Sequence, residues 1–118
     1  MTGSKRVPER IANVLRILDD KKVEDPVVLD VAELVGYTDF LIIASGRSSP
    51  HVQAMAEAVA ASLKIKGQRG LHLEGDPAAT WVLIDGGDFV LHLFQPDARR
   101  YYALEDLWDD APRLKSGT

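Results

Sequence analysis

The segment best suited to chemistry is "ASGRSSP", residues 44–50, a Ser-Gly loop between an apolar run and an amphipathic segment. Backbone N–H groups at a helix start can bind a phosphate. The loop lacks the ending of a P-loop and the three-glycine spacing of a dinucleotide fold. Nucleotidyltransferases follow such a loop with paired carboxylates for magnesium, whereas "MAEAVAASLKIKGQ" offers only Glu57. We therefore predict helix capping, with Ser49 as the N-cap and Pro50 as the first helical residue.

Two other groups of residues are candidate metal ligands. The "DGGD" segment, residues 85–88, offers two carboxylates without a third ligand, and aspartate is common beside glycine turns. His51, His72 and His92 stand far apart and form no His-x-x-x-His pair. No serine lies in a Gly-x-Ser-x-Gly elbow. We predict no catalytic residue, metal or cofactor, and therefore no enzyme.

Composition narrows the class of protein and of partner. The 118 residues are expected to form one domain, 1–118, with a core over about 8–110 and short flexible tails. No apolar run approaches the ~20 residues of a membrane span, and the absence of cysteine fits a cytoplasmic protein. The net charge of −4 disfavours direct binding to RNA through phosphates and favours a basic protein partner.

The hydrophobic periodicity predicts eight elements in the order α-β-β-α-β-β-β-α. The predicted helices are 8–21, 50–66 with Gly67 as a C-terminal stop, and 97–108; the predicted strands are 26–31, 39–45, 70–75 and two within 80–94. This order indicates an α/β sandwich with a mixed five-stranded sheet and flanking helices.

The last two strands form a predicted hairpin around Gly86-Gly87. A two-residue turn there would pair Leu83 with Val90 and Trp81 with His92. Alternation places an entirely apolar row on one face, namely Val82, Ile84, Phe89, Leu91 and Leu93. The other face mixes Trp81, Leu83, Asp85, Asp88, Val90 and His92, a composition like that of a binding patch. The alternative is that a helix covers this face and leaves its polar groups at the rim.

The segment "PDARRYYALEDLWDDAP", residues 96–112, places Tyr101, Leu104 and Trp108 on one helical stripe. Docking onto the sheet is the default role for such a helix. Adjacent tyrosines and arginines are also enriched in interface hot spots.

Taken together, these segments resemble a known family. "VVLDV", "TDFLIIASGRSSPHVQAMAEAV", "EG", "WVLIDGGDFVLHLF" and "ARRYYALEDLW" match the ribosomal silencing factor family, also called Iojap, in order over about residues 11–110. The "DGGD" turn departs from the family, which often has an aromatic residue before the glycine. The resemblance implies a fold similar to nucleotidyltransferases without their catalytic carboxylates.

The resemblance also implies a function. Members of the family bind the large ribosomal subunit through ribosomal protein L-fourteen, block joining of the small subunit, and lower translation when nutrients are scarce. Trp81 corresponds to a family residue implicated in that contact, and it lies on the mixed face of the predicted hairpin. We therefore favour a binding patch there, with little direct contact to RNA. Its expected residues are Trp81, Leu83, Asp88, Val90, His92, Arg100, Tyr101, Leu104 and Glu105.

Two alternatives stay open from the residues alone. One is a small nucleotide-binding enzyme that uses the Ser45-Gly46 loop. The other is an interaction module that forms a homodimer through the same hairpin face.

Overall fold

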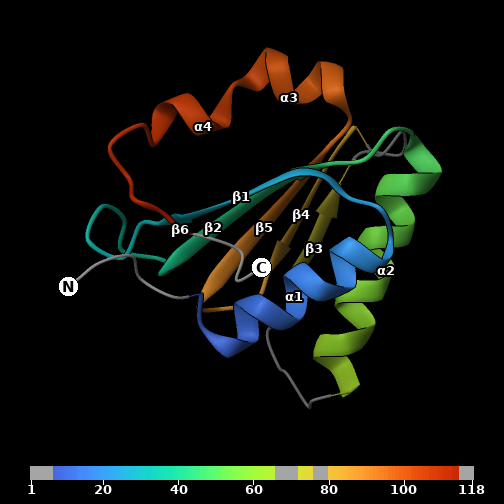
Figure 1. Cartoon of the computed structure of the whole chain (residues 1–118), viewed down its shortest axis with the longest axis horizontal. Coiled ribbons are helices and arrows are strands. Elements are labelled where there is room, and N and C mark those ends of the chain that lie inside the picture. Colours follow the sequence, from blue (N-terminus) through green and yellow to red (C-terminus); the bar gives the residue numbers. More distant parts are fainter. Residues whose placement is uncertain (1–6, 66–71, 76–79, 115–118) are drawn as a thin grey trace.

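The computed structural model describes residues 7–65, 72–75 and 80–114 and places them in three layers. The elements are α1 (Glu9–Asp20), β1 (Glu24–Asp30), β2 (Phe40–Ser45), α2 (Ser49–Ile65), β3 (His72–Gly75), β4 (Trp81–Asp85), β5 (Phe89–Phe94), α3 (Pro96–Tyr102), α4 (Leu104–Leu107) and β6 (Arg113–Leu114). One sheet separates α1 and α2 from α3 and α4 (Figure 1). The predicted stop at Gly67 and the first residues of the strand predicted over 70–75 lie outside the described residues.

The sheet has the strand order β3-β4-β5-β2-β1-β6. Among the described strands, β2 and β5 pair in parallel and the other neighbours are antiparallel. The prediction of a mixed sheet with flanking helices is confirmed. The sixth strand, β6, was not predicted, because two residues after a proline carry no alternation to recognise. It pairs with β1 at the edge of the sheet.

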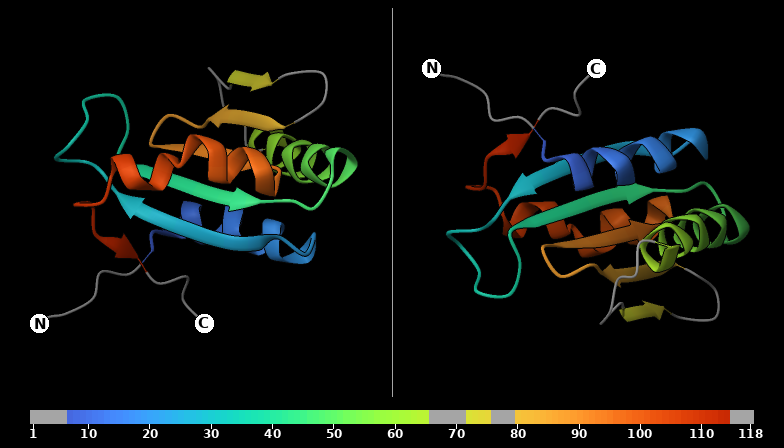
Figure 2. Two further views of the ribbon diagram at one scale, coloured as in Figure 1. Left: turned by 90° about the horizontal axis from the view of Figure 1, so that it is seen from above. Right: turned by 90° about the horizontal axis from the view of Figure 1, so that it is seen from below.

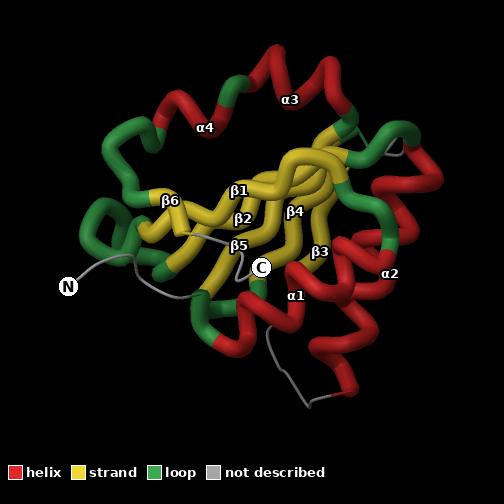
Figure 3. The backbone as a smooth tube through the Cα atoms, viewed as in Figure 1, coloured by secondary structure: helices red, strands yellow, loops and turns green. Residues whose placement is uncertain are grey.

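The sheet buries a different cluster on each face. On the side of α1 and α2, the apolar row of the hairpin packs against buried residues that include Ile11, Leu18, Val52, Met55 and Val59. The views from above and below show α3 and α4 over one face and α1 and α2 over the other (Figure 2). The tube in Figure 3 shows the strands as one curved layer between these helices. The apolar row predicted from alternation is thus confirmed as core.

The hairpin register predicted from the glycine pair is wrong. Leu83 pairs with His92, and Trp81 pairs with Phe94. The N–H of Gly86 donates to the Phe89 carbonyl at 2.9 Å, so the turn residues are Gly87 and Asp88. Gly87 has φ of +91°, at the position where type II′ turns take glycine, whereas a type I′ turn over Gly86-Gly87 needs positive φ at both residues. The register moves by two residues, so the side chains within β4 and β5 keep their predicted faces.

The prediction of one continuous helix over residues 97–108 is also wrong. It breaks at Ala103, whose φ of +46° belongs to the left-handed region, and it becomes α3 and α4. The N–H of Ala103 still donates to the carbonyl of Arg99 at 2.9 Å, which closes the last turn of α3. The break ends the helical periodicity from which the stripe of Tyr101, Leu104 and Trp108 was predicted. We call the α3–α4 segment, residues 96–107, the strap.

Candidate functional site

The Ser-Gly loop uses its polar groups inside the protein. The N–H of Gly46 donates to the Phe94 carbonyl at 2.9 Å, and the hydroxyl of buried Ser45 lies 2.8 Å from an Arg99 Nη. A Cβ at position 46 would stand 2.7 Å from the end of the Met55 side chain and 2.9 Å from Cγ2 of Val52, so glycine favours the close approach of the loop to α2. These contacts leave the loop engaged with β5, α2 and α3, as a structural helix start requires.

The N-cap of α2 lies one residue earlier than predicted. Ser48, and not Ser49, precedes the first helical residue, and its hydroxyl accepts from the N–H of His51 at 3.4 Å. The His51 Nδ1 accepts from the N–H of Arg47 at 2.9 Å, and its Nε2 lies 2.6 Å from the Lys21 carbonyl. Because a carbonyl only accepts, Nε2 carries the proton, and a neutral His51 joins the start of α2 to the end of α1. The prediction of capping is confirmed, with a different residue as the cap.

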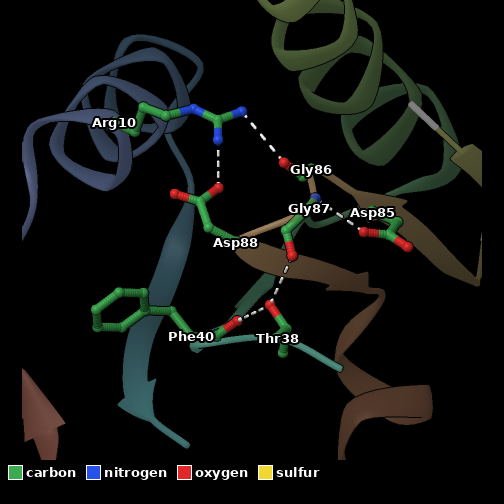
Figure 4. A network of polar contacts seen from close by, with 7 residues as sticks. All are labelled: Arg10, Thr38, Phe40, Asp85, Gly86, Gly87 and Asp88. Carbon is green, nitrogen blue, oxygen red and sulfur yellow. Dashed lines mark hydrogen bonds and ion pairs between the residues drawn. The ribbon is translucent and has the colours of Figure 1, made fainter. Parts of the chain in front are cut away.

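The "DGGD" turn is a polar junction, drawn in Figure 4. Asp88 pairs with Arg10 of α1, which also donates to the Gly86 carbonyl at 3.2 Å. Asp85 accepts from the N–H of Gly87 at 2.9 Å, and the Thr38 hydroxyl lies 3.3 Å from the Gly87 carbonyl. The prediction that Asp88 shares a face with Trp81 is therefore wrong, because Asp88 turns toward α1 on the other side of the sheet. Within the described residues, no three His, Asp or Glu side chains gather as a metal site.

The mixed face of the hairpin is largely covered. Val90 is 5% exposed and His92 is 7% exposed, so the prediction of a free surface at these two residues is wrong. Val90 belongs to the second buried cluster, against which Leu83, Leu104 and Trp108 pack, and His92 is a buried polar residue on the same face of β5. The alternative that the sequence left open, in which a helix covers this face, describes Val90 and His92 correctly. Leu83 and Leu104 remain half-buried at its margin.

Trp81 is the centre of an aromatic group that rises from the sheet to the surface. Its ring stacks on buried Phe94 with centroids 5.1 Å apart, and Tyr102 of the strap lies 4.6 Å from it. Tyr101 meets Tyr102 edge-on at 5.1 Å and is 82% exposed. Such tilted and edge-on pairs are the favourable arrangements of aromatic rings. We call Trp81, Tyr101 and Tyr102 the aromatic ladder.

Under the ladder, Trp81 donates a hydrogen bond to His92. The indole Nε1 lies 3.0 Å from His92 Nδ1, and because an indole N–H only donates, Nδ1 must be unprotonated. Burial lowers the pKa of His92 from 6.5 to about 4, since desolvation penalises the charged imidazolium. His92 is therefore a neutral acceptor at ordinary pH.

Arg99 holds the strap to the sheet. Its guanidinium makes two hydrogen bonds to the Glu105 carboxylate, at 2.9 and 3.0 Å, and thereby spans the break at Ala103. A further hydrogen bond from Arg99 to the Ser45 hydroxyl joins the strap to the end of β2. The Arg99 hydrogen bond is the main cause that lowers the pKa of Glu105, opposed by partial burial. Arg100, by contrast, is exposed and pairs with Asp97 of its own helix.

The strap also presents apolar and acidic groups outward. Neither α3 nor α4 contains a buried residue, and Leu107 is 70% exposed. Asp106, Asp109 and Asp110 are exposed on α4 and the turn after it. An open groove of about 590 Å³ runs beside the strap, but Arg99 and Arg100, which line it, are paired with carboxylates.

Sequence reasoning missed two residues of this region. Tyr102, not Tyr101, meets Trp81, and Arg99, not Arg100, anchors the strap. One member of each adjacent Arg-Arg and Tyr-Tyr pair contacts the rest of the fold, although Tyr102 stays 47% exposed. The predicted helical stripe did not identify these members, because it was drawn through the break at Ala103.

These features define a small α/β domain whose aromatic ladder runs from β4 to the exposed surface of the strap, while its Ser-Gly loop is engaged internally. In the part of the chain that the structure describes, no helix is both long and apolar enough to cross a membrane. Residues 4–117 match the family model described as "Ribosomal silencing factor during starvation".

Individual relatives agree with this match. A ribosomal silencing factor from Halalkalibacterium halodurans is 40% identical over 107 residues, which is 91% of this chain and 92% of the relative. The mouse protein "Mitochondrial assembly of ribosomal large subunit protein 1" is 33% identical over 98 residues, covering 80% of this chain and 43% of the relative. A crystal structure from Chromobacterium violaceum has a TM-score of 0.81 and 34% identity, covering 89% of this chain and 88% of the other.

The chain therefore belongs to the ribosomal silencing factor family, as its sequence segments had indicated. Ribosome association and regulation of translation follow from that membership.

Proposed function

We propose that this protein binds the large ribosomal subunit through ribosomal protein L-fourteen and sterically blocks joining of the small subunit, which lowers translation under nutrient limitation. The observation that carries the proposal is the family match over residues 4–117. The name of the mouse relative, which refers to the large ribosomal subunit, agrees with this choice of subunit. The mechanism is occlusion, so it requires no catalysis and no cofactor, and the protein acts in the cytoplasm.

The aromatic ladder is the surface that we assign to the partner. Tyr101 projects from the strap, and Tyr102 connects it to Trp81. Tryptophan and tyrosine are enriched among the few residues that contribute most of the binding energy of an interface. Exposed acids at Asp106, Asp109 and Asp110 complement a basic partner such as a ribosomal protein, and the net charge of −4 disfavours extensive contact with RNA.

The residues expected from the sequence then divide into three roles. Trp81, Arg100 and Tyr101 have surface that a partner can reach, with Leu83, Leu104 and Glu105 at the margin. Val90 and His92 lie beneath and support the surface. Asp88 stabilises the turn through Arg10 on the opposite side of the sheet.

Co-sedimentation with purified ribosomal subunits tests the proposal. The protein should travel with large subunits in a sucrose gradient and be absent from assembled ribosomes. Large subunits loaded with it beforehand should form fewer complete particles when small subunits are added. Equal recovery with both subunits, or with assembled ribosomes, would contradict occlusion.

A pair of serine variants tests the absence of catalysis. Ser48→Ala should reduce the free energy of unfolding by about 0.5–2 kcal/mol, because the cap of α2 is lost. Ser49→Ala, the matched control, should leave it nearly unchanged. Both variants should still bind large subunits. A rise in melting temperature with millimolar ATP and magnesium, abolished by these substitutions, would favour the nucleotide-binding alternative.

A further inference from the structure

His92 is the buried titratable group that the proposed function leaves without a direct role. At 7% exposure it lies beneath the strap, out of reach of a partner while the strap is in place. It stands diagonally across the hairpin from Trp81, since Leu83 is its paired neighbour on β4 and Phe94 is the neighbour of Trp81. Diagonal neighbours on one face are within reach of aromatic side chains.

The hydrogen bond between these two residues determines how the indole is oriented. The stacked ring of Phe94 and the tilted ring of Tyr102, with centroids 5.1 and 4.6 Å from that of Trp81, hold the indole by ring contacts. Ring stacking is tolerant of rotation within the ring plane, whereas an N–H···N bond of 3.0 Å requires the indole nitrogen to point at His92 Nδ1. Turning the ring over would leave a buried acceptor and a donor unpaired, which is costly.

We propose that His92 is a positioning residue, which fixes the orientation of the Trp81 indole from inside the fold and so prepares the aromatic ladder for its partner. The proposal rests on the proposed function, because it assigns the ladder to partner binding. His92 acts through Trp81 and makes no contact with the partner. The neutral imidazole supplies an acceptor that neither Phe94 nor Tyr102 offers to the indole. A surface oriented before binding loses less conformational entropy in the complex.

Two substitutions separate the acceptor from the ring. His92→Phe keeps an aromatic ring and removes the acceptor. His92→Asn keeps a polar atom near the position of Nδ1, and it is uncharged at every pH. We expect His92→Phe to weaken binding to purified large subunits about fivefold, which corresponds to about 1 kcal/mol, the net contribution of one hydrogen bond. His92→Asn should restore binding to within about twofold of wild type.

A double-mutant cycle tests whether His92 acts through Trp81. Trp81→Phe removes the indole N–H and retains a ring. In that background, His92→Phe should cause no further loss of affinity. A loss of the same size with and without the indole would overturn the proposal, because His92 would then act on the partner or on overall stability. Unchanged affinity in His92→Phe alone would overturn it as well.

The free protein gives a readout that needs no ribosome. The Trp81 indole N–H resonance, assigned by its absence in Trp81→Phe, should shift and exchange faster with solvent in His92→Phe, but not in His92→Asn. If His92→Phe does not fold, the Trp81 indole N–H resonance of the wild-type protein still tests the proposal. An indole proton that exchanges with solvent as freely as in a peptide would show that His92 does not orient the indole. If the wild-type protein fails to bind large subunits, the proposed function is refuted. The claim that His92 prepares the aromatic ladder for this partner is then refuted as well.

Discussion

The two faces of the sheet bury different kinds of side chain under different kinds of helix. Under α1 and α2, the buried cluster is entirely apolar, and both helices contribute fully buried residues such as Ile11 and Val52. Under the strap, the sheet buries His92 and Ser45 beside apolar neighbours, and neither strap helix has a buried residue.

This difference separates stability from recognition. Helices with deeply buried side chains resist local opening, whereas segments with few buried contacts open at lower free energy. The strap is held by oriented contacts, namely the ring of Tyr102 on Trp81 and the Arg99 hydrogen bonds to Ser45 and Glu105, together with the packing of partly buried Ala98 and Leu104 on the second cluster. Such contacts leave Tyr101 and Leu107 exposed for a partner.

The largest loss of stability is expected for a substitution on the apolar face of the sheet, under α1 and α2. Ile84→Ala should reduce the free energy of unfolding by about 2–5 kcal/mol, because it leaves a cavity where a 0% exposed side chain packs. Leu83→Ala, the matched control one position along β4, should cost less because Leu83 is only half-buried on the other face. Urea unfolding measures both. If Leu83→Ala costs as much as Ile84→Ala, the two faces do not differ in stability as described.

The next largest effect is a pH dependence of stability that arises from His92, on the face of the sheet beneath the strap. The pKa of His92 is about 4 in the folded protein and 6.5 when unfolded, so the unfolded chain binds the extra proton between these values. Stability should therefore fall as pH decreases from 6.5 to 4, by up to about 3 kcal/mol, and be fully present above 6.5. Urea unfolding at a series of pH values measures this slope. His92→Asn should show a smaller slope over the same interval, and an unchanged slope would assign the effect to other groups.

A smaller effect is expected when the strap loses its anchor. Arg99→Ala should reduce the free energy of unfolding by about 1–3 kcal/mol, because hydrogen bonds to a charged partner and to buried Ser45 are lost. Amide exchange of Leu104–Leu107 should accelerate while exchange in α2 stays slow, and the pKa of Glu105 should rise toward its usual value. Arg100→Ala, the matched control in α3, should change none of these three measurements appreciably. Equal acceleration in α2 would show that the strap and the core open together.

The smallest effect on stability, with a larger one on binding, is expected for Tyr101. Because its side chain is 82% exposed, Tyr101→Ala should change the free energy of unfolding by no more than about 0.5 kcal/mol. Binding to large subunits should weaken about tenfold if Tyr101 is a contact residue. Tyr37→Ala, an exposed tyrosine in the loop before β2, is the control and should alter neither quantity. Equal loss of binding in both variants would place the partner surface elsewhere.

The sequence by itself determined five of the six described strands, which side chains within the hairpin strands share a face, and the family. Alternation with a period of two assigns faces correctly even when the register is off by two residues, as it was for Trp81 and His92. For the same reason, alternation could not reveal that the turn is Gly87-Asp88. The predicted face of Trp81, Leu83, Val90 and His92 is correct, whereas the exposure predicted for Val90 and His92 is not.

Only the tertiary structure decided which polar groups meet. Arg10 and Asp88 are 78 positions apart, and no local pattern specifies that they pair across the end of the sheet. Tyr102 contacts Trp81 and Tyr101 is 82% exposed, although helical spacing had placed Tyr101 on one stripe with Leu104 and Trp108, because the left-handed backbone at Ala103 ends α3 and interrupts that spacing. Periodicity records local geometry along one element, whereas burial and pairing depend on which other element lies opposite. The acceptor under Trp81 is therefore visible only once the strands and the strap are packed together.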